Sequence, residues 1–433
     1  MHSSSVQSRR HKFLRKFYYT IAIIIAYVTF YYAHTHCKYQ SPNNTIAVKV
    51  INNYSIYYLQ NHTTQVAVNK PKLETKYILL WTNPHNSPFV YFGNGSAVFE
   101  NKKCLWKNCY VTGDRNYLGD YSEFDVIVFN GPQLNQILNY YDIPKKRLLS
   151  QKYVYANVES AATYPICSDI WNDFFNWTWT YRLDSDSIWG YISVRNATGH
   201  VIGPNEIMNW INISDMDDID EKLKSKLKSK KKLVAWFVSN CDSMSLREEY
   251  VKIFQQELRK YNSDVDIFGS CGKHQCPRDI MPRCLDVLER DYYFYFAFEN
   301  AISQDYVTEK ILYPLNHNTV PVVFGGANYT RFMPHGIYLN AREMEPKVLA
   351  KTMYDITRNF EVYCKFFRWK KYYSYHFRHE IPDTDDYCNF CAVINNDNLI
   401  KTTTVYKDFD RWWAGNDTCF SNNDDHLYED KTI

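Results

Sequence analysis

Apolar residues occur in short runs separated by polar segments, and this pattern predicts the strands of an α/β protein. Three runs in the first half of the chain are rich in β-branched and aromatic residues, and they cover residues 77–81, 124–129 and 152–156. They end at Asn83-Pro84, Asn130-Gly131 and Asn157. A helical stretch over 133–141 separates the second run from the third. Strands that alternate with helices predict a first doubly wound domain at 73–221.

A second set of apolar runs predicts another α/β domain at 233–370. Ser245 and Glu248 have the spacing of a capping box at the start of a helix, and a further helical region covers 346–366. The basic segment 222–232 between the domains is predicted to be a solvated helix or linker. A tail that contains disulfides follows at 371–433. The strands of this second domain are predicted at 232–240, 265–269, 292–298 and 319–325.

The start of the chain has the pattern of a membrane anchor. A basic tail, 1–16, precedes an uncharged apolar run at 17–33 with tyrosines at both ends. We expect a transmembrane signal anchor with the tail in the cytosol and the remaining chain in the lumen. A cleaved signal peptide is the alternative, but no small-x-small cleavage site follows the run. The polar segment 34–72 is predicted to be a stem.

Composition agrees with a lumenal protein. The 433 residues carry a net charge of +3, so nothing in the overall charge indicates binding to nucleic acid. Of the 12 cysteines, eleven follow residue 100, and most should pair in an oxidising compartment, with at least one left over. For Cys388 and Cys391 a structural disulfide is favoured over a zinc site. Nine glycosylation sequons begin at Asn43, Asn53, Asn61, Asn94, Asn176, Asn196, Asn212, Asn328 and Asn416.

Polar residues concentrate after the aromatic run 292–298. Glu299 and Asn300 follow it directly, and Glu309 and Lys310 fall in the first turn of the next predicted helix. In open α/β sheets, ligands bind beyond the carboxyl ends of the strands, and helix N-termini there favour anions. The pattern therefore predicts a site for a phosphorylated ligand, with Arg247 as a second cation. An ordinary α/β core with a surface Glu–Lys pair fits the spacing equally well.

Several segments together resemble the alpha-1,3/4-fucosyltransferase family. The likeness runs from about residue 76 to Cys391 and preserves the order and spacing of the motifs. It implies a GT-B fold, in which two Rossmann-like doubly wound domains face a cleft, behind one N-terminal transmembrane helix. The matching segments are Glu159-Ser160, 175–186, 235–241 with Arg247, 266–272, Ala297–Lys310 and 320–329.

The resemblance implies transfer of L-fucose from GDP-β-L-fucose to the O3 hydroxyl of N-acetylglucosamine, with inversion. Glu159 matches the family's proposed base, and such a base typically contributes about 10²–10⁴-fold to the rate. Arg247 and Lys310 match its diphosphate-binding pair, and Glu309 matches a carboxylate that hydrogen-bonds the nucleotide. The remaining residues expected to line the donor cleft are Asn240, Glu299, Asn300, Tyr306 and Thr308.

No essential metal is expected. Asp184-Ser-Asp186 has the form of a DxD motif, but it lies in the acceptor half and is interpreted as structural, with Asp184 or Asp186 as a partner of Arg182. The cationic side chains would then carry the diphosphate charge, although a divalent ion could stimulate the reaction. Three residues depart from the family pattern: Ala161 and Ala301 replace a proline and a serine, and Pro314 should shorten or kink the helix after Thr308.

The resemblance also implies a single-pass type II protein of the Golgi membrane. Two alternatives remain: a GT-B transferase for another nucleotide sugar, and an inactive lumenal glycan-binding relative. The acceptor is left open between antennal N-acetyllactosamine, the N-glycan chitobiose core and chitin-like oligomers, although the segment Cys104–Arg115 is more similar to the core-modifying subgroup. The oligomeric state is open too.

Overall fold

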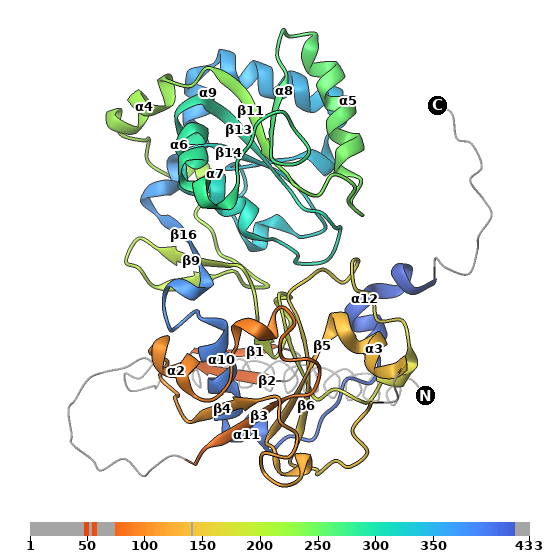
Figure 1. Cartoon of the computed structure of the whole chain (residues 1–433). Coiled ribbons are helices and arrows are strands. Elements are labelled where there is room, and N and C mark those ends of the chain that lie inside the picture. The colour runs from red at the N-terminus through yellow and green to blue at the C-terminus, as the bar shows by residue number, and fades with distance from the viewer. Residues whose placement is uncertain (1–46, 52–53, 59–73, 140–141, 421–433) are drawn as a thin grey trace, which may run out of the picture. The chain divides into compact units, whose positions relative to one another are not determined.

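The computed structural model describes residues 47–51, 54–58, 74–139 and 142–420 (Figure 1). The predicted membrane anchor at 17–33 lies outside these residues, and none of the described helices is long and apolar enough to cross a membrane. Within the predicted stem, β1 (Ala47–Ile51) and β2 (Tyr54–Tyr58) pair as an antiparallel hairpin. The compact unit that begins at Lys70 contains all the residues discussed below.

The first sheet of this unit has six strands in the order β4-β3-β5-β6-β7-β8, and every neighbouring pair is parallel. The sequence predicted its central strands, because parallel strands covered on both faces are apolar throughout. The predicted helix over 133–141 is observed as α3 (Leu134–Asn139). The strands are β3 (Lys76–Leu80), β4 (Cys109–Thr112), β5 (Val126–Asn130), β6 (Lys152–Asn157), β7 (Trp177–Thr180) and β8 (Ser187–Ile188).

The second sheet is also parallel, with the order β12-β11-β13-β14-β15. The chain adds β12 on one side of β11 and β13 on the other, so the strand order reverses between β11 and β13. Together the two sheets confirm the predicted α/β class. The strands are β11 (Lys232–Phe237), β12 (Val265–Phe268), β13 (Tyr292–Phe298), β14 (Val320–Phe324) and β15 (Leu339–Asn340).

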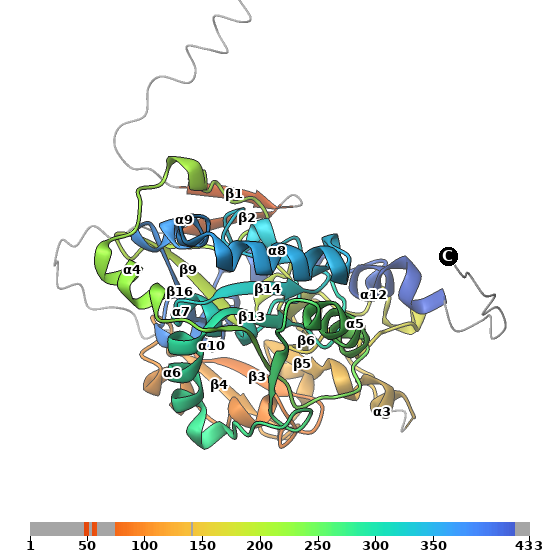
Figure 2. The same cartoon turned by 90° about the horizontal axis from the view of Figure 1, so that it is seen from above.

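Alternate residues of β13 face the two helical layers of this sheet. Phe294, Phe296 and Phe298 pack with α4 (Glu221–Lys228), α5 (Arg247–Arg259), α8 (Pro346–Arg358) and α9 (Phe360–Lys365). Tyr295 and Ala297 face α6 (Met281–Asp291) and α7 (Leu312–Asn316). Figure 2 shows α8 and α9 on one side of β13 and β14, and α6 and α7 on the other.

Two local predictions in this half need correction. Ser245 does not cap α5, because the residue before the helix is Leu246 in a left-handed conformation, and Glu248 instead accepts a hydrogen bond from the Ser243 hydroxyl at 2.8 Å. The basic segment 222–232 was predicted to be a solvated helix or linker; its first part lies in α4 (Glu221–Lys228), whereas Lys230, after the helix, is buried. Its ammonium donates to two backbone carbonyls, and burial lowers its pKa to about 7.

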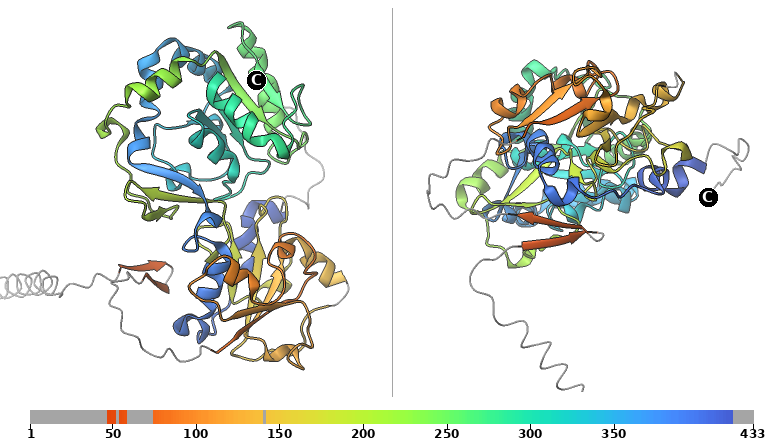
Figure 3. Two further views of the ribbon diagram at one scale, coloured as in Figure 1. Left: turned by 60° about the vertical axis from the view of Figure 1, so that its left-hand side comes forward. Right: turned by 90° about the horizontal axis from the view of Figure 1, so that it is seen from below.

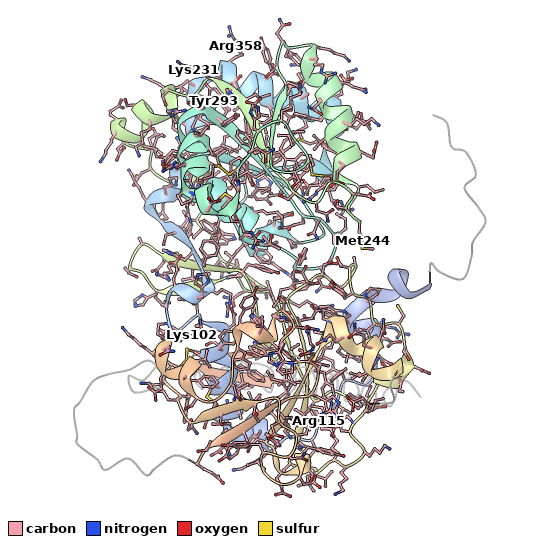
Figure 4. All side chains as sticks on the ribbon, viewed as in Figure 1. Lys102, Arg115, Lys231, Met244, Tyr293 and Arg358 are labelled. Atoms are coloured by element: carbon pink, nitrogen blue, oxygen red, sulfur yellow. A yellow bond between two sulfur atoms is a disulfide. The ribbon has the colours of Figure 1, made fainter. Side chains whose placement is uncertain are left out.

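The C-terminal tail packs against the first sheet, far from its neighbours in sequence. Disulfides join Cys104 to Cys388 and Cys109 to Cys391. Cys388 and Cys391, which the sequence favoured as structural cysteines, therefore pair with two different cysteines and not with each other. Figure 3 shows this blue segment beside the orange strands of the first sheet. Lys102, labelled in Figure 4, adds an ion pair with Asp385 at 2.6 Å. The tail helices are α10 (Asp386–Ile394), α11 (Asp397–Ile400) and α12 (Phe409–Phe420).

Two further disulfides and a free cysteine lie in the second α/β domain of the described chain. Cys241 pairs with Cys271 and Cys276 pairs with Cys284, while Cys364 is free and buried, which confirms that a cysteine is left over. One sequon is unsuited to glycosylation in the folded chain. The Asn176 side chain is buried, and its amide nitrogen donates to the carbonyl of Thr404 at 2.9 Å.

Candidate active site

The predicted donor-binding residues lie at the point where the second sheet reverses its strand order. Asn240 and Arg247 follow β11, and the other six follow β13 between Glu299 and Lys310. Parallel strands bring both loops to the same edge of the sheet. Ser245 joins them: its N–H donates to the Asn300 carbonyl at 3.1 Å, and its hydroxyl donates to the Glu299 carbonyl at 2.8 Å. This is the edge at which open α/β sheets bind ligands.

Glu299 and Lys310 form a buried ion pair at the centre of this edge. The Glu299 side chain is 2% exposed and lies 2.8 Å from the Lys310 ammonium. Thr308 completes the carboxylate's hydrogen bonds, with its N–H at 2.8 Å and its hydroxyl at 2.9 Å. Burial lowers the pKa of Lys310, but Glu299 and Glu309 outweigh burial and raise it. Lys310 donates to Glu299 and Thr308 and keeps one ammonium hydrogen for a further acceptor.

Arg247 is packed inward at the first residue of α5. Its side chain is 4% exposed, and it donates to the carbonyls of Phe298 at 2.6 Å and Asn240 at 3.0 Å. A third bond reaches the adjacent carboxylate of Glu248 at 3.0 Å. Arg247 therefore ties the end of β13 to the loop after β11. A guanidinium has five donors, so one hydrogen on each terminal nitrogen remains for a ligand.

Glu159 comes from the first sheet and meets the donor loop through one hydrogen bond. It follows β6 and is half-buried, and its carboxylate accepts from the Tyr306 hydroxyl at 3.1 Å. The same hydroxyl lies 3.5 Å from the Asn300 amide oxygen. Burial and the nearby carboxylates raise the pKa of Tyr306, so it stays protonated and donates. The structure thus brings the predicted base together with two predicted donor-side residues.

Asn240 and Glu309 lie at the rim of this arrangement. Asn240 is exposed, and its amide oxygen accepts from the N–H of Asp242 at 3.3 Å. Glu309 is 36% exposed at its side chain and lies 3.9 Å from the Lys310 ammonium. Pro314 falls within the five-residue helix α7, which is as short as the proline predicts. The site therefore has a buried, paired centre and an open rim.

Asp184 and Asp186 both have structural partners. Arg182 donates two hydrogen bonds to Asp184, at 2.9 and 2.8 Å, which confirms the predicted pairing. Asp186 accepts from the Thr178 N–H at 2.9 Å and from the Tyr406 hydroxyl at 2.8 Å. In the part of the chain that the structure describes, no group of three or more His, Cys, Asp and Glu residues is placed to hold a metal ion.

Two tyrosines that were not among the predicted site residues hold the loop that bears Glu159. The Tyr191 hydroxyl donates to the carbonyl of Val158 at 2.7 Å, and the Tyr181 hydroxyl accepts from the N–H of Ala161 at 3.0 Å. A proline at position 161, as in the family pattern, would lack this N–H, so the departure changes how the loop is held. Tyr181 lies in the matching segment 175–186, whereas no motif marks Tyr191 among the 38 tyrosines of the chain.

These features define an α/β protein with two parallel sheets, whose candidate site lies at the switch point of the second sheet and is contacted by Glu159 from the first. Two family models match, "Fucosyltransferase, N-terminal" at residues 73–192 and "Glycosyltransferase family 10 (fucosyltransferase) C-term" at residues 227–412. The relative "Alpha-(1,3)-fucosyltransferase C" of Drosophila melanogaster is 31% identical over 78% of each chain. The chain belongs to the alpha-1,3/4-fucosyltransferase family and is an enzyme of that family.

Other similar proteins carry related names. "3-galactosyl-N-acetylglucosaminide 4-alpha-L-fucosyltransferase FUT3" of Bos taurus is 28% identical over 68% of this chain and 71% of its own length. The solved structure "Crystal Structure of alpha1,3-Fucosyltransferase with GDP-fucose" aligns over 80% of this chain and 96% of that one, with a TM-score of 0.45 and 11% identity.

Proposed function

We propose that the chain transfers L-fucose from GDP-β-L-fucose to the O3 hydroxyl of N-acetylglucosamine with inversion, forming an alpha-1,3 linkage. The observation that carries the proposal is the hydrogen bond from the Tyr306 hydroxyl to the Glu159 carboxylate, because it joins the loop after β6 to the segment after β13. This contact supports Glu159 as a base that acts beside the donor. A single displacement needs both a base for the attacking hydroxyl and donors for the departing diphosphate.

In the proposed reaction, a Glu159 carboxylate oxygen takes the proton of the acceptor O3 hydroxyl. O3 then forms a bond to the anomeric carbon of fucose from the side opposite the diphosphate. The bond between that carbon and the diphosphate oxygen breaks, and GDP leaves with the electron pair. Inversion follows from this single displacement at the anomeric carbon.

Lys310 and Arg247 are proposed to hold the diphosphate with their remaining hydrogens. Both cations are already balanced by carboxylates, Lys310 by Glu299 and Arg247 by Glu248. Hydrogen bonds from charged donors are about twice as strong as neutral ones, and a buried pair is fixed in place before the ligand arrives. Glu309, at the rim, is the proposed contact to the nucleotide, and Asn240, in the loop after β11, is proposed to line the same donor cleft.

The chain is further proposed to act as a single-pass type II protein of the Golgi membrane, without an essential metal. The basic tail and apolar run of the first 33 residues support this placement. If EDTA abolished activity and Mn²⁺ restored it, the cationic side chains would not be sufficient for the leaving group.

The decisive test combines a panel of nucleotide sugars with a panel of defined glycans. Fucose from GDP-fucose should appear on N-acetylglucosamine, and the product linkage should be alpha-1,3. A product from another nucleotide sugar would favour the alternative transferase, and no product with any donor would favour an inactive relative. Arg247→Ala and Lys310→Ala should each weaken GDP binding in calorimetry, and unchanged affinity would refute their role.

A further inference from the structure

A cavity of about 270 Å³ lies beside the loop that carries Glu159. Three parts of the chain line it: residues 161–162 and 181–182 of the first sheet's loops, residues 302–304 of the donor loop, and residues 411–415 of α12. Its volume is close to the lower end of the roughly 300–1,000 Å³ that small-molecule sites occupy. The cavity therefore has room for about one sugar ring, but not for a branched glycan.

Trp412 forms a fixed wall of this cavity. The Arg182 guanidinium lies 4.3 Å from the centre of the Trp412 ring and also bonds the Trp412 carbonyl. Asp184 holds both residues, since it accepts from Arg182 at 2.8 Å and from the indole N–H at 3.2 Å. A half-buried indole held on two sides is a rigid apolar surface, of the kind against which the C–H face of a sugar can pack.

Two polar side chains at the cavity have no partner in the described part of the chain. Gln304 and Arg411 are exposed, and neither side chain makes a hydrogen bond or ion pair there. Tyr181 and Ser303 add hydroxyl groups to the lining. An apolar wall with a few polar groups is the usual composition of a small-molecule site. Hydroxyl-rich sugars offer acceptors and donors that suit both free side chains.

The cavity adjoins the proposed base without including it. The Tyr181 and Tyr306 rings lie 5.0 Å apart, and Tyr306 bonds Glu159. The Ala162 N–H donates to the Ser303 hydroxyl at 3.0 Å, which joins the two loops that line the cavity. The sugar that receives fucose must place its O3 at Glu159, and Glu159 is not among the lining residues. A sugar in the cavity is therefore a neighbour of the reacting sugar.

We propose that this cavity, the Trp412 pocket, binds the sugar next to the N-acetylglucosamine that receives fucose. The ring packs against Trp412, and Gln304 and Arg411 hydrogen-bond its hydroxyls. This inference rests on the proposed function. It makes the C-terminal helix α12 part of acceptor recognition, and it predicts that an acceptor disaccharide is used better than a single sugar.

The test uses Gln304→Ala and Arg411→Ala, because both side chains are exposed and their loss should not affect folding. Acceptors are the methyl glycoside of N-acetylglucosamine, N-acetyllactosamine and chitobiose. Each variant should raise KM for the better disaccharide about three- to tenfold, the effect of one hydrogen bond. For the monosaccharide glycoside, kcat/KM should stay within twofold, as should the Kd for GDP. Lys407→Ala, an exposed cation of the same segment outside the lining, is the matched control and should change neither.

If Gln304→Ala and Arg411→Ala lower kcat/KM equally for the monosaccharide and the disaccharides, or for neither, the pocket assignment is overturned. If the wild-type chain transfers no fucose to any acceptor, the proposed function fails separately. The pocket is then judged by saturation-transfer NMR with the two disaccharides. Binding that wild type shows and Arg411→Ala loses supports the pocket, and absence of binding by wild type refutes it.

Discussion

The two sides of the candidate active site are built differently. On the donor side, Lys310 is paired with Glu299 and Arg247 with Glu248. Arg247 also donates to the backbone carbonyls of Phe298 and Asn240. On the acceptor side, the Glu159 carboxylate has one hydrogen bond, from Tyr306, and the adjoining cavity carries free polar groups on Gln304 and Arg411. One side is fixed before any ligand binds, and the other keeps its hydrogen-bonding capacity for the ligand.

This difference agrees with what each side is proposed to bind. A diphosphate is invariant, and a rigid set of charged donors stabilises it without reorganisation during the reaction. Acceptor glycans vary around the reacting sugar, so a surface with free polar groups on separate segments suits them. Changes on the donor side should therefore affect stability and nucleotide affinity together, whereas changes on the acceptor side should affect turnover and acceptor use alone.

The largest effect is expected for Glu159→Gln. The amide keeps the shape and the contact with Tyr306 but cannot take the acceptor proton, so kcat should fall about 10²–10⁴-fold. Steady-state kinetics with a saturating acceptor measure the loss. Calorimetry should give an unchanged Kd for GDP, because Glu159 belongs to the first sheet. Turnover near that of wild type would remove Glu159 from the role of base.

The second prediction separates stability from affinity on the donor side. Lys310→Met leaves the Glu299 carboxylate buried without a cation, which should cost about 3–5 kcal/mol in the free energy of unfolding. Chemical denaturation measures this loss. The double variant Lys310→Met/Glu299→Gln should recover most of the stability, because no charge is then left unpaired.

GDP affinity should fall in both the single and the double variant, since the ammonium hydrogen proposed for the diphosphate is lost in each. If the double variant regains stability and also binds GDP as wild type does, Lys310 has a structural role only. If the single variant is as stable as wild type, the Glu299 carboxylate, whose side chain is 2% exposed, does not need the Lys310 ammonium for stability.

The same contrast explains what the sequence could predict. The sequence predicted where the segment from Glu299 to Lys310 lies, because it is continuous and follows a strongly apolar strand, and parallel sheets fix the edge at which such a segment falls. The roles of its residues in donor binding stay predictions. The partner of Lys310 was not predicted, since which of Glu299 and Glu309 turns inward depends on the loop path. That path requires Gly326, where a Cβ would lie 2.7 Å from the Ser303 backbone.

The acceptor side was predicted only at Glu159 and Arg182. Tyr181, Gln304 and Trp412 come from three segments that are distant in sequence, and disulfides and tail packing bring the last of these to the first sheet. No spacing rule relates such residues. Ser245 was assigned to the wrong contact for a similar reason, because its hydroxyl is used across the two loops rather than at the helix start.

The third prediction concerns how the free energy of unfolding depends on pH through Asp186, a structural residue between β7 and β8. Burial raises the pKa of Asp186 to about 6 from 3.8, although hydrogen bonds from Tyr406 and Thr178 lower it. The folded state therefore binds the proton of the Asp186 carboxyl group more tightly than the unfolded state does. The protonated carboxyl group contributes its full amount to the free energy of unfolding below about pH 4, and this contribution is lost as the pH rises through about 6.

Asp186→Asn should remove this dependence. The free energy of unfolding of wild type minus that of the variant should fall by on the order of 3 kcal/mol between pH 4 and 7. Denaturation at several pH values measures the difference, and other titrating groups cancel in it. A difference that stays constant over this range would show that Asp186 is ionised throughout.

The smallest effect is expected for Tyr306→Phe, and it decides to which side Tyr306 belongs. The resemblance assigns Tyr306 to the donor cleft, whereas its hydroxyl bonds the Glu159 carboxylate at 3.1 Å. A hydrogen bond to a charged group contributes about 1.5 kcal/mol or more, so kcat should fall about tenfold. Tyr191→Phe is the matched control, because that hydroxyl bonds the backbone carbonyl of Val158 instead. Kd for GDP should be unchanged in both variants. Weaker GDP binding at unchanged kcat would place Tyr306 with the donor. The hydrogen bond from Tyr306 to Glu159 would then not contribute to catalysis.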